Sequence, residues 1–104
     1  MTDACLTDLL AVRVMGWSAG PDRFMTGNRS WIARWRFQPA EKLPDALRLL
    51  EVAAPEEYSL LGDSEGNSRV HVRIGDAAGE ACCPSKPRAI TWAIARAVGI
   101  EVEP

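Results

Sequence analysis

The residues that could carry acid–base or nucleophilic chemistry are few. His71 is the only histidine of the sequence, whereas a zinc site needs three or four Cys, His or carboxylate ligands at characteristic spacings. We therefore interpret His71 as a solvated histidine on a strand. A nucleophile pair of Cys83 and His71 is conceivable if their strands are neighbours, but no third group is placed to orient the histidine.

The carboxylates and glycines do not form a recognisable site either. Glu56 and Glu57 are adjacent, so their side chains diverge on a strand, whereas the paired carboxylates of a hydrolase face each other. The turn GDSEGNS at 62–68 is acidic and would repel a phosphate, and neither GxxxxGK[ST] nor GxGxxG occurs. We predict that the chain is not an enzyme and needs no metal and no cofactor.

The uneven feature of the sequence is a segment rich in arginine and tryptophan. Residues 12–37 contain five arginines and one acid and carry a charge of +4, while the rest carries −6 of the net −2. The same segment holds three of the four tryptophans. Arg and Trp are enriched at the energetic centres of protein interfaces, and they also bind single-stranded nucleic acid by stacking and phosphate contacts.

Three interpretations of this segment stay open. Its aromatic residues can form part of the core with solvated arginines, it can bind a protein, or it can bind nucleic acid. Trp92 lies off the apolar face of the last predicted helix, so it is either covered by residues 17–38 or an exposed anchor. The candidate partner-binding residues are Arg23, Arg29, Trp31, Arg34, Trp35, Arg36, Arg69, His71, Arg73 and Trp92.

The elements that position these residues follow from length and periodicity. A chain of 104 residues with 47% apolar and 25% charged residues is typical of one globular domain. Apolar periods of 3.6 predict helices, and periods of two predict strands. The predicted helices are 2–15, 43–54 and 86–98; the predicted strands are 58–61, 69–74 and 79–83, with a further short extended or edge strand at 31–37. The short connections favour an antiparallel meander.

We therefore expect an α/β protein of the α+β type, with a small antiparallel sheet of three or four strands packed with three helices. The expected order is α, extended segment, α, β, β, β, α. Thr2 and Ser85 are candidate N-caps, and Gly16 and Gly99 are helix stops. Small residues should let the last helix lie close to the sheet.

Burial of particular side chains follows from the same patterns. We expect Leu47 to lie on the buried face of the helix 43–54, and Thr91 and Ala95 to lie on the outer face of the last helix. The side of the middle strand that carries Arg69, His71 and Arg73 should be open, or covered only by residues 17–38, because a buried cation without a partner is costly. Three cysteines are an odd number, so we expect no disulfide framework, and we expect Cys5, Cys82 and Cys83 to be reduced and buried.

The expected location is the cytoplasm. No apolar run approaches the roughly 18 residues that a membrane span requires. The sequence opens MTDACLTDLL, with an acid where a signal peptide would carry Lys or Arg. We expect no membrane partner.

Three stretches resemble the phage ABA sandwich domain family, which consists of small bacteriophage and prophage proteins. They are VMGW at 14–17, FQPAEKLPDALRLLE at 37–51 and CCPSKPRAITWAIARAVG at 82–99. The last stretch is similar to the family's strand that leads into a helix opening with Ala-Ile. The resemblance implies a small α/β sandwich of phage origin, in a family mostly without known function. Residues 23–36 depart from the family pattern.

The resemblance and the Arg/Trp segment lead to one functional hypothesis. The chain is expected to be a non-catalytic phage accessory protein in the host cytoplasm that binds a host or phage protein. A concrete version is an inhibitor of a bacterial anti-phage defence complex, of the anti-CRISPR type. The alternatives are a structural or housekeeping homo-oligomer that buries its Trp-rich strand against its own copy, and a small nucleic-acid-binding protein.

Overall fold

The computed structural model describes residues 3–27 and 29–100, which form three α-helices, one 3₁₀ helix and two three-stranded antiparallel sheets. The helices are α1 (Asp3–Arg13), η1 (Arg34–Arg36), α2 (Leu43–Ala53) and α3 (Lys86–Ala97). The first sheet contains β1 (Ser18–Ala19), β2 (Arg23–Gly27) and β3 (Ser30–Ala33). The second contains β4 (Glu57–Gly62), β5 (Ser68–Ile74) and β6 (Ala77–Cys83). The predicted α+β class, the three helices and the C-terminal antiparallel meander are confirmed.

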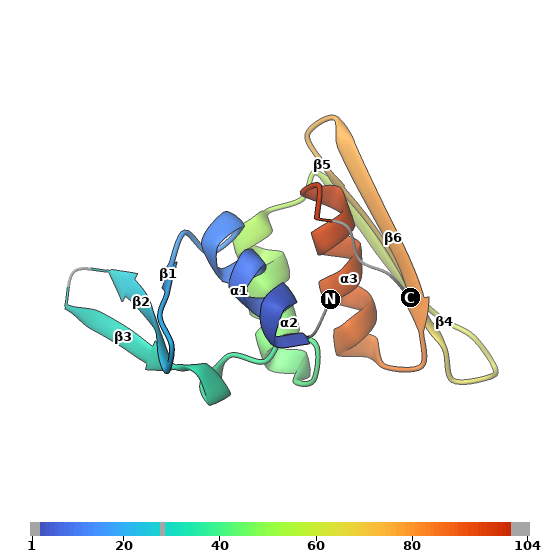
Figure 1. Cartoon of the computed structure of the whole chain (residues 1–104). Helices are drawn as coiled ribbons and strands as arrows, with labels where there is room; N and C mark the ends of the chain where they lie inside the picture. The colour runs from blue at the N-terminus through green and yellow to red at the C-terminus, as the bar shows by residue number, and fades with distance from the viewer. Residues whose placement is uncertain (1–2, 28, 101–104) are drawn as a thin grey trace.

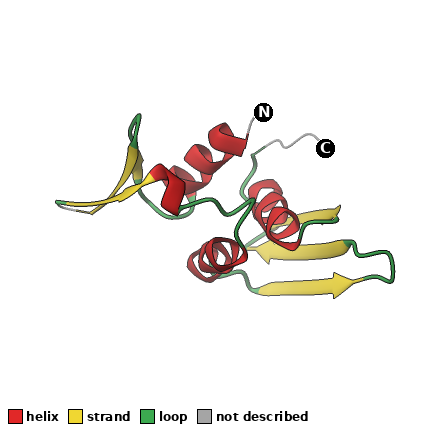
Figure 2. Ribbon diagram, turned by 90° about the horizontal axis from the view of Figure 1, so that it is seen from below, coloured by secondary structure: helices red, strands yellow, loops and turns green. Residues whose placement is uncertain are grey.

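The two sheets lie at opposite ends of an elongated molecule, with the helices between them (Figures 1 and 2). The overall extents are 44 × 28 × 22 Å. Helix α3 packs on β5 and β6 and also contacts α2. Residues 17–38 therefore lie far from the β4–β6 sheet and do not cover it.

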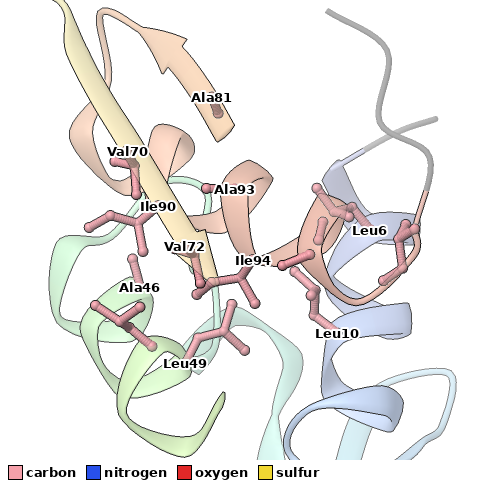
Figure 3. Packing of buried hydrophobic residues seen from close by; sticks show 14 of the residues in the cluster. Leu6, Leu10, Ala46, Leu49, Val70, Val72, Ala81, Ile90, Ala93 and Ile94 are labelled. Atoms are coloured by element: carbon pink, nitrogen blue, oxygen red, sulfur yellow. The ribbon is translucent and has the colours of Figure 1, made fainter. Parts of the chain in front are cut away.

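The main core forms between α3 and one face of β5. Val70 and Val72 are fully buried and face the α3 residues Ile90 and Ala93 (Figure 3). Leu49 of α2 and Leu10 of α1 extend this cluster around the other sides of α3. Such a central helix needs apolar residues around much of its circumference.

Helix α3 approaches β6 so closely that one position must be glycine. A Cβ added at Gly79 would lie 2.1 Å from the carbonyl oxygen of Ala93 and 2.5 Å from the amide nitrogen of Ala97. Both atoms belong to the backbone, so neither can move aside without shifting the helix. The small residues of α3 therefore permit backbone contact with the sheet, as the sequence predicted.

The predicted cap of α3 and the predicted glycine stops of α1 and α3 are confirmed. The Ser85 hydroxyl accepts a hydrogen bond from the Arg88 amide at 3.4 Å, which caps α3. Gly99, with φ of 87°, follows the end of this helix in a left-handed conformation. Gly16, with φ of 73°, follows α1 in the same way. The expected cap Thr2 lies outside the described residues.

The prediction of a short edge strand over 31–37 is confirmed for its first half, where β3 lies, and is wrong for the second half. The chain is extended only to Ala33, and η1 follows it. Residues 17–33 supply a whole second sheet in place of a single strand. The side chain of Arg34 hydrogen-bonds to Asp8 and to the Gly20 carbonyl, and this bonding holds the turn that brings Phe37 into the core.

Several burial predictions also need correction. Leu47 is 44% exposed, and Leu49 is fully buried in its place, because the contact with α3 decides which side of α2 faces inward. Thr91 and Ala95 are fully buried because α3 is covered on more than one side. The cysteines are free thiols, but the expected burial holds only partly: Cys5 and Cys82 are exposed and Cys83 is half-buried.

Candidate protein-interaction surface

Part of the Arg/Trp segment is core. Trp17, Phe24 and Phe37 are all buried, and their ring centroids lie 5.0 to 6.0 Å apart in tilted and edge-on contacts. Aromatic pairs favour this geometry because the ring edge is positive and the face negative. The core interpretation of the segment is therefore correct for Trp17 and Phe37.

The outer face of the β2–β3 hairpin is built differently. Met25 pairs with Trp31 across the two strands, and adjacent residues of a strand point to opposite faces. Phe24 points inward, so Met25 and Trp31 point into solvent, where they are 41% and 57% exposed. The Arg23 guanidinium lies 4.8 Å from the centroid of the Trp31 ring. This face presents an apolar pair with a cation beside it.

Trp35 lies just beyond this hairpin on η1 and is 63% exposed. The guanidinium of the exposed Arg36 lies 5.2 Å from its ring centroid. Trp35 also lines a pocket of about 370 Å³, in the size range of small ligand sites. The other lining residues come from α1, β2, η1 and the loop before α2: Thr7, Phe24, Arg34, Phe37, Gln38, Ala40 and Glu41.

Arg34 has a structural role. Its guanidinium donates two hydrogen bonds to the Asp8 carboxylate, of which the Nη2–Oδ2 contact is 3.2 Å long. Its Nε donates to the Gly20 carbonyl at 2.8 Å. The Arg34 side chain is 29% exposed and that of Asp8 35%. Arg34 thus joins α1, the β1–β2 turn and η1, and it offers little free charge to a partner.

Arg23 is also paired within the chain. Its Nε donates to Asp22 at 3.1 Å. The hydrogen bond from Arg23 is the largest influence on Asp22 and lowers the pKa of that carboxyl, while the same contact raises the pKa of Arg23. Arg29 sits in the β2–β3 turn with φ of 65° and is exposed. Of the arginines on the β1–β3 sheet and η1, Arg23 and Arg34 are thus paired within the chain, whereas Arg29 and Arg36 are exposed.

Arg69, His71 and Arg73 lie at the other end of the molecule, on the face of β5 that carries no helix. The side chains of Arg69 and Arg73 are 62% and 40% exposed, so the expectation that this face is open is confirmed. Arg69 lies 3.7 Å from Glu80, and Arg73 pairs with Glu56 and Glu57 at 3.0 and 3.3 Å.

The acid pair at the start of β4 therefore binds an arginine of the neighbouring strand. The hydrogen bond to Glu57 is the largest influence on Arg73 and raises the pKa of its guanidinium. Both carboxylates contact the same guanidinium, so the expectation that their side chains diverge is wrong. Glu56 precedes the first residue of β4, so strand alternation does not separate it from Glu57.

Trp92 lies on α3, away from both the β1–β3 sheet and the face of β5 that carries Arg69 and Arg73. It is half-buried and packs against the main core, so it is not an exposed anchor. The guanidinium groups of Arg88 and Arg96 lie 5.5 and 5.9 Å from its ring centroid. Its Nε1 is buried and finds no acceptor in the described part of the chain.

Sequence reasoning missed two contributors to the candidate surface, Met25 and the pocket. No local signal marked Met25, because Phe24 and Met25 are adjacent apolar residues and give no period of two, although one is buried and the other exposed. The pocket combines residues from 7 to 41, and no local pattern brings them together. We call the β1–β3 sheet with η1, residues 18–36, the Arg/Trp region.

Two further features concern the described residues as a whole. Within residues 3–27 and 29–100, no three His, Cys, Asp or Glu side chains cluster in a way that could hold a metal ion. No helix in the same ranges has the length and apolar character to span a bilayer.

Comparison with known proteins identifies a likeness in fold. A phage protein from Bacillus cereus ATCC 14579, known from a crystal structure, superposes with a TM-score of 0.81. The match covers 99% of this chain and 93% of that chain, at 16% sequence identity. This chain has the fold of a phage protein. No family model matches the sequence, so membership of the phage ABA sandwich family stays a prediction, and no curated protein matches it.

Proposed function

We propose that this chain is a non-catalytic phage accessory protein that binds another protein through its Arg/Trp region. The observation that carries the proposal is the exposure of Trp31 and Trp35, each more than half exposed, each with a guanidinium beside its ring. Trp17 already fills the aromatic core together with two phenylalanines. Exposed Trp and Arg together are the residue types that most often dominate binding energy in protein interfaces.

The charge balance supports a protein partner over nucleic acid. Binding to phosphates depends on free cations that release counterions. Arg34 and Arg23 are paired with Asp8 and Asp22, which leaves few free cations on the region. An arginine of this chain also lies beside each of the rings of Trp31 and Trp35 and occupies part of the surface on which a base would stack.

The pocket beside Trp35 suggests how a partner is anchored. Phe24, Phe37 and Ala40 lie beneath it but are themselves buried, so a partner reaches the rim that the exposed Trp35 and Glu41 form. A side chain of the partner would rest against this rim, while Arg36 contacts the surrounding surface. Interfaces commonly combine aromatic residues with a polar rim.

The target that we propose is a host protein in the cytoplasm, with a bacterial anti-phage defence complex, such as a CRISPR effector, as the specific case. The support is the likeness in fold to a phage protein and the kind of surface, because inhibition by occlusion needs shape and a few anchors but no catalytic groups.

The experiment is affinity purification from the bacterial host with wild type, with the Trp31→Ala/Trp35→Ala variant and with a control. The control, Val12→Ala/Val52→Ala, removes two half-exposed apolar side chains elsewhere on the surface. We expect wild type and the control to recover the same partner proteins. The tryptophan variant should recover at least about tenfold less of them. Equal recovery with all three would refute the proposal.

A second measurement separates protein from nucleic acid as the partner. Wild type should give no gel shift with single-stranded DNA or RNA at low salt. A shift that weakens steeply as salt rises and disappears with Arg29→Glu/Arg36→Glu would assign the region to nucleic acid instead. Arg34 is unsuitable for this test because its removal would disturb the fold.

A further inference from the structure

The two edges of the β4–β6 sheet differ. At the β6 edge, one backbone carbonyl, that of Glu80, accepts a hydrogen bond from the Arg96 guanidinium of α3. Strand β4 forms the other edge and pairs only with β5 among the described residues. All six of its residues are exposed. Residues 58–62, YSLLG, carry no charge, although natural proteins usually protect a free edge with charges, proline or a bulge.

The helix layer ends one strand before this edge. Tyr58 and Leu60 pair with Val72 and Val70, so all four side chains lie on the face that α3 covers. Val70 and Val72 are fully buried, but Tyr58 is 57% and Leu60 36% exposed. The apolar face of the sheet thus continues into solvent at β4.

Helix α2 extends the apolar surface beyond the strand. A groove of about 350 Å³ separates α2 from the start of β4. It is lined by Leu47, Leu50, Glu51, Ala54, Pro55 and Tyr58. Leu47, the residue that the sequence placed in the core, is 44% exposed there. The free edge therefore has an apolar flank on one side.

We infer that β4 pairs antiparallel with β4 of a second copy, which joins the two sheets into one of six strands. A two-fold axis at Ser59 places Tyr58 opposite Leu60 of the second copy, and Leu60 opposite its Tyr58. Residues that face each other directly across an antiparallel pair lie on the same side of the sheet. This register therefore covers both exposed apolar side chains with each other, and cross-strand pairs of an aromatic and an aliphatic residue stabilise a sheet.

The charges on the open face agree with the same register. Glu57 would lie opposite Leu61 of the second copy, whose β5 neighbour is Arg69. Two strand spacings separate Glu57 from that arginine, about 10 Å between backbones, which two long side chains can span.

In this register the start of each β4, with Glu56 and Glu57, lies beside the end of the other β4, where Asp63 follows the strand. Arg73 already pairs with Glu56 and Glu57, and this lessens the repulsion between these carboxylates. The interface would thus be polar at the rim and apolar on the helix side.

Sedimentation velocity over a range of protein concentrations tests this inference. Wild type should sediment as a dimer, at twice the 11.4 kDa of the monomer. Ser59→Lys places two like charges at the axis and should weaken the dimer at least about tenfold. Ser18→Lys, the same change at an exposed strand serine of the other sheet, should leave it intact. A wild-type monomer at all concentrations would overturn the proposal, as would a dimer lost with Trp35→Asp but retained with Ser59→Lys.

Disulfide trapping tests the register itself. In a chain with Cys5, Cys82 and Cys83 changed to serine, Ser59→Cys places two cysteines opposite each other across the axis, at a Cα separation of about 5 Å that allows a disulfide. Mild oxidation should yield a covalent dimer. Leu60→Cys is the matched control, because Leu60 faces Tyr58 of the second copy and not itself. Cross-linking of Leu60→Cys in place of Ser59→Cys would overturn the register.

Discussion

The two sheets of this protein differ in how each is covered. The β4–β6 sheet lies against α3, with Val70 and Val72 fully buried and with backbone contact at Gly79. The β1–β3 sheet buries Phe24 on one face and leaves Met25 and Trp31 in solvent on the other. Burial of apolar area is the main driving force of folding. The β4–β6 sheet therefore carries the larger part of the buried core, whereas the β1–β3 sheet leaves apolar side chains exposed on one face, which is the physical basis of the proposed function.

The largest effect on stability is expected at Gly79. Gly79→Ala adds a methyl group where only 2.1 Å separates it from a backbone oxygen of α3, so the helix must move off the sheet. The free energy of unfolding should fall by about 4 kcal/mol or more, measured by urea denaturation. Gly62→Ala is the control, because an added Cβ there meets nothing within 4 Å. Equal stability of the two variants would contradict the proposed contact between α3 and β6.

The second prediction compares two aromatic residues of the β2–β3 hairpin. Phe24→Ala removes a fully buried ring and should cost about 3 to 5 kcal/mol of unfolding free energy. Trp31→Ala removes a larger side chain that is 57% exposed, and should cost about 1 kcal/mol or less. Thermal or urea unfolding measures both. If Trp31→Ala were the more destabilising variant, the hairpin would have its outer face buried, and the proposed surface would not exist.

The third prediction concerns the partly buried ion pair of Arg34 and Asp8. Arg34→Met should lower the unfolding free energy by about 1 to 3 kcal/mol, because it also leaves the Gly20 carbonyl without its donor. A double-mutant cycle with Asp8→Asn should show that the two changes are not additive. Arg36→Met is the control and should change stability little, since Arg36 is exposed. Additive effects of the two changes would show that the pair does not hold α1 to η1.

The smallest effect is the pH dependence contributed by Asp22. Its folded pKa lies below the ordinary 3.8 because Arg23 donates to the carboxylate. The ionised form is thus favoured in the folded state, and the stabilisation is complete above about pH 4 and lost as pH falls through the folded pKa. The stability difference between wild type and Asp22→Asn should shrink on acidification below pH 4. A difference that stays constant down to pH 2 would rule out this contribution.

The sequence predicted the elements whose partners are near in the chain. The alternation around Val70 and Val72 identified β5, and Ser85 and Gly99 marked the ends of α3, because these signals act within a few residues. The pattern of residues 31–37 misled, since Trp35 and Phe37 continue a period of two beyond the end of the strand. What turns the chain at Arg34 is a bond to Asp8, 26 residues away, which no local pattern reveals.

Predictions for the surface divide in the same way. The concentration of Arg and Trp correctly indicated a region with exposed indoles. Composition could not show that Trp17 lies in the core or that Arg34 is structural. It also could not show that Arg69, His71 and Arg73 lie on β5, at the opposite end of the molecule (Figure 1). Leu47 and Leu49 show the same limit, because the stripe of apolar residues on α2 is wide and its contact with α3 selects the buried side.

The most direct test of the central claim follows the four indole N–H signals by NMR while a partner purified with the wild-type protein is added. Trp31 and Trp35 lie on the proposed surface, whereas Trp17 is buried and Trp92 packs on the main core. The account predicts that the signals of Trp31 and Trp35 shift or broaden while those of Trp17 and Trp92 change little. Unchanged signals of Trp31 and Trp35 in the presence of a saturating partner would contradict it.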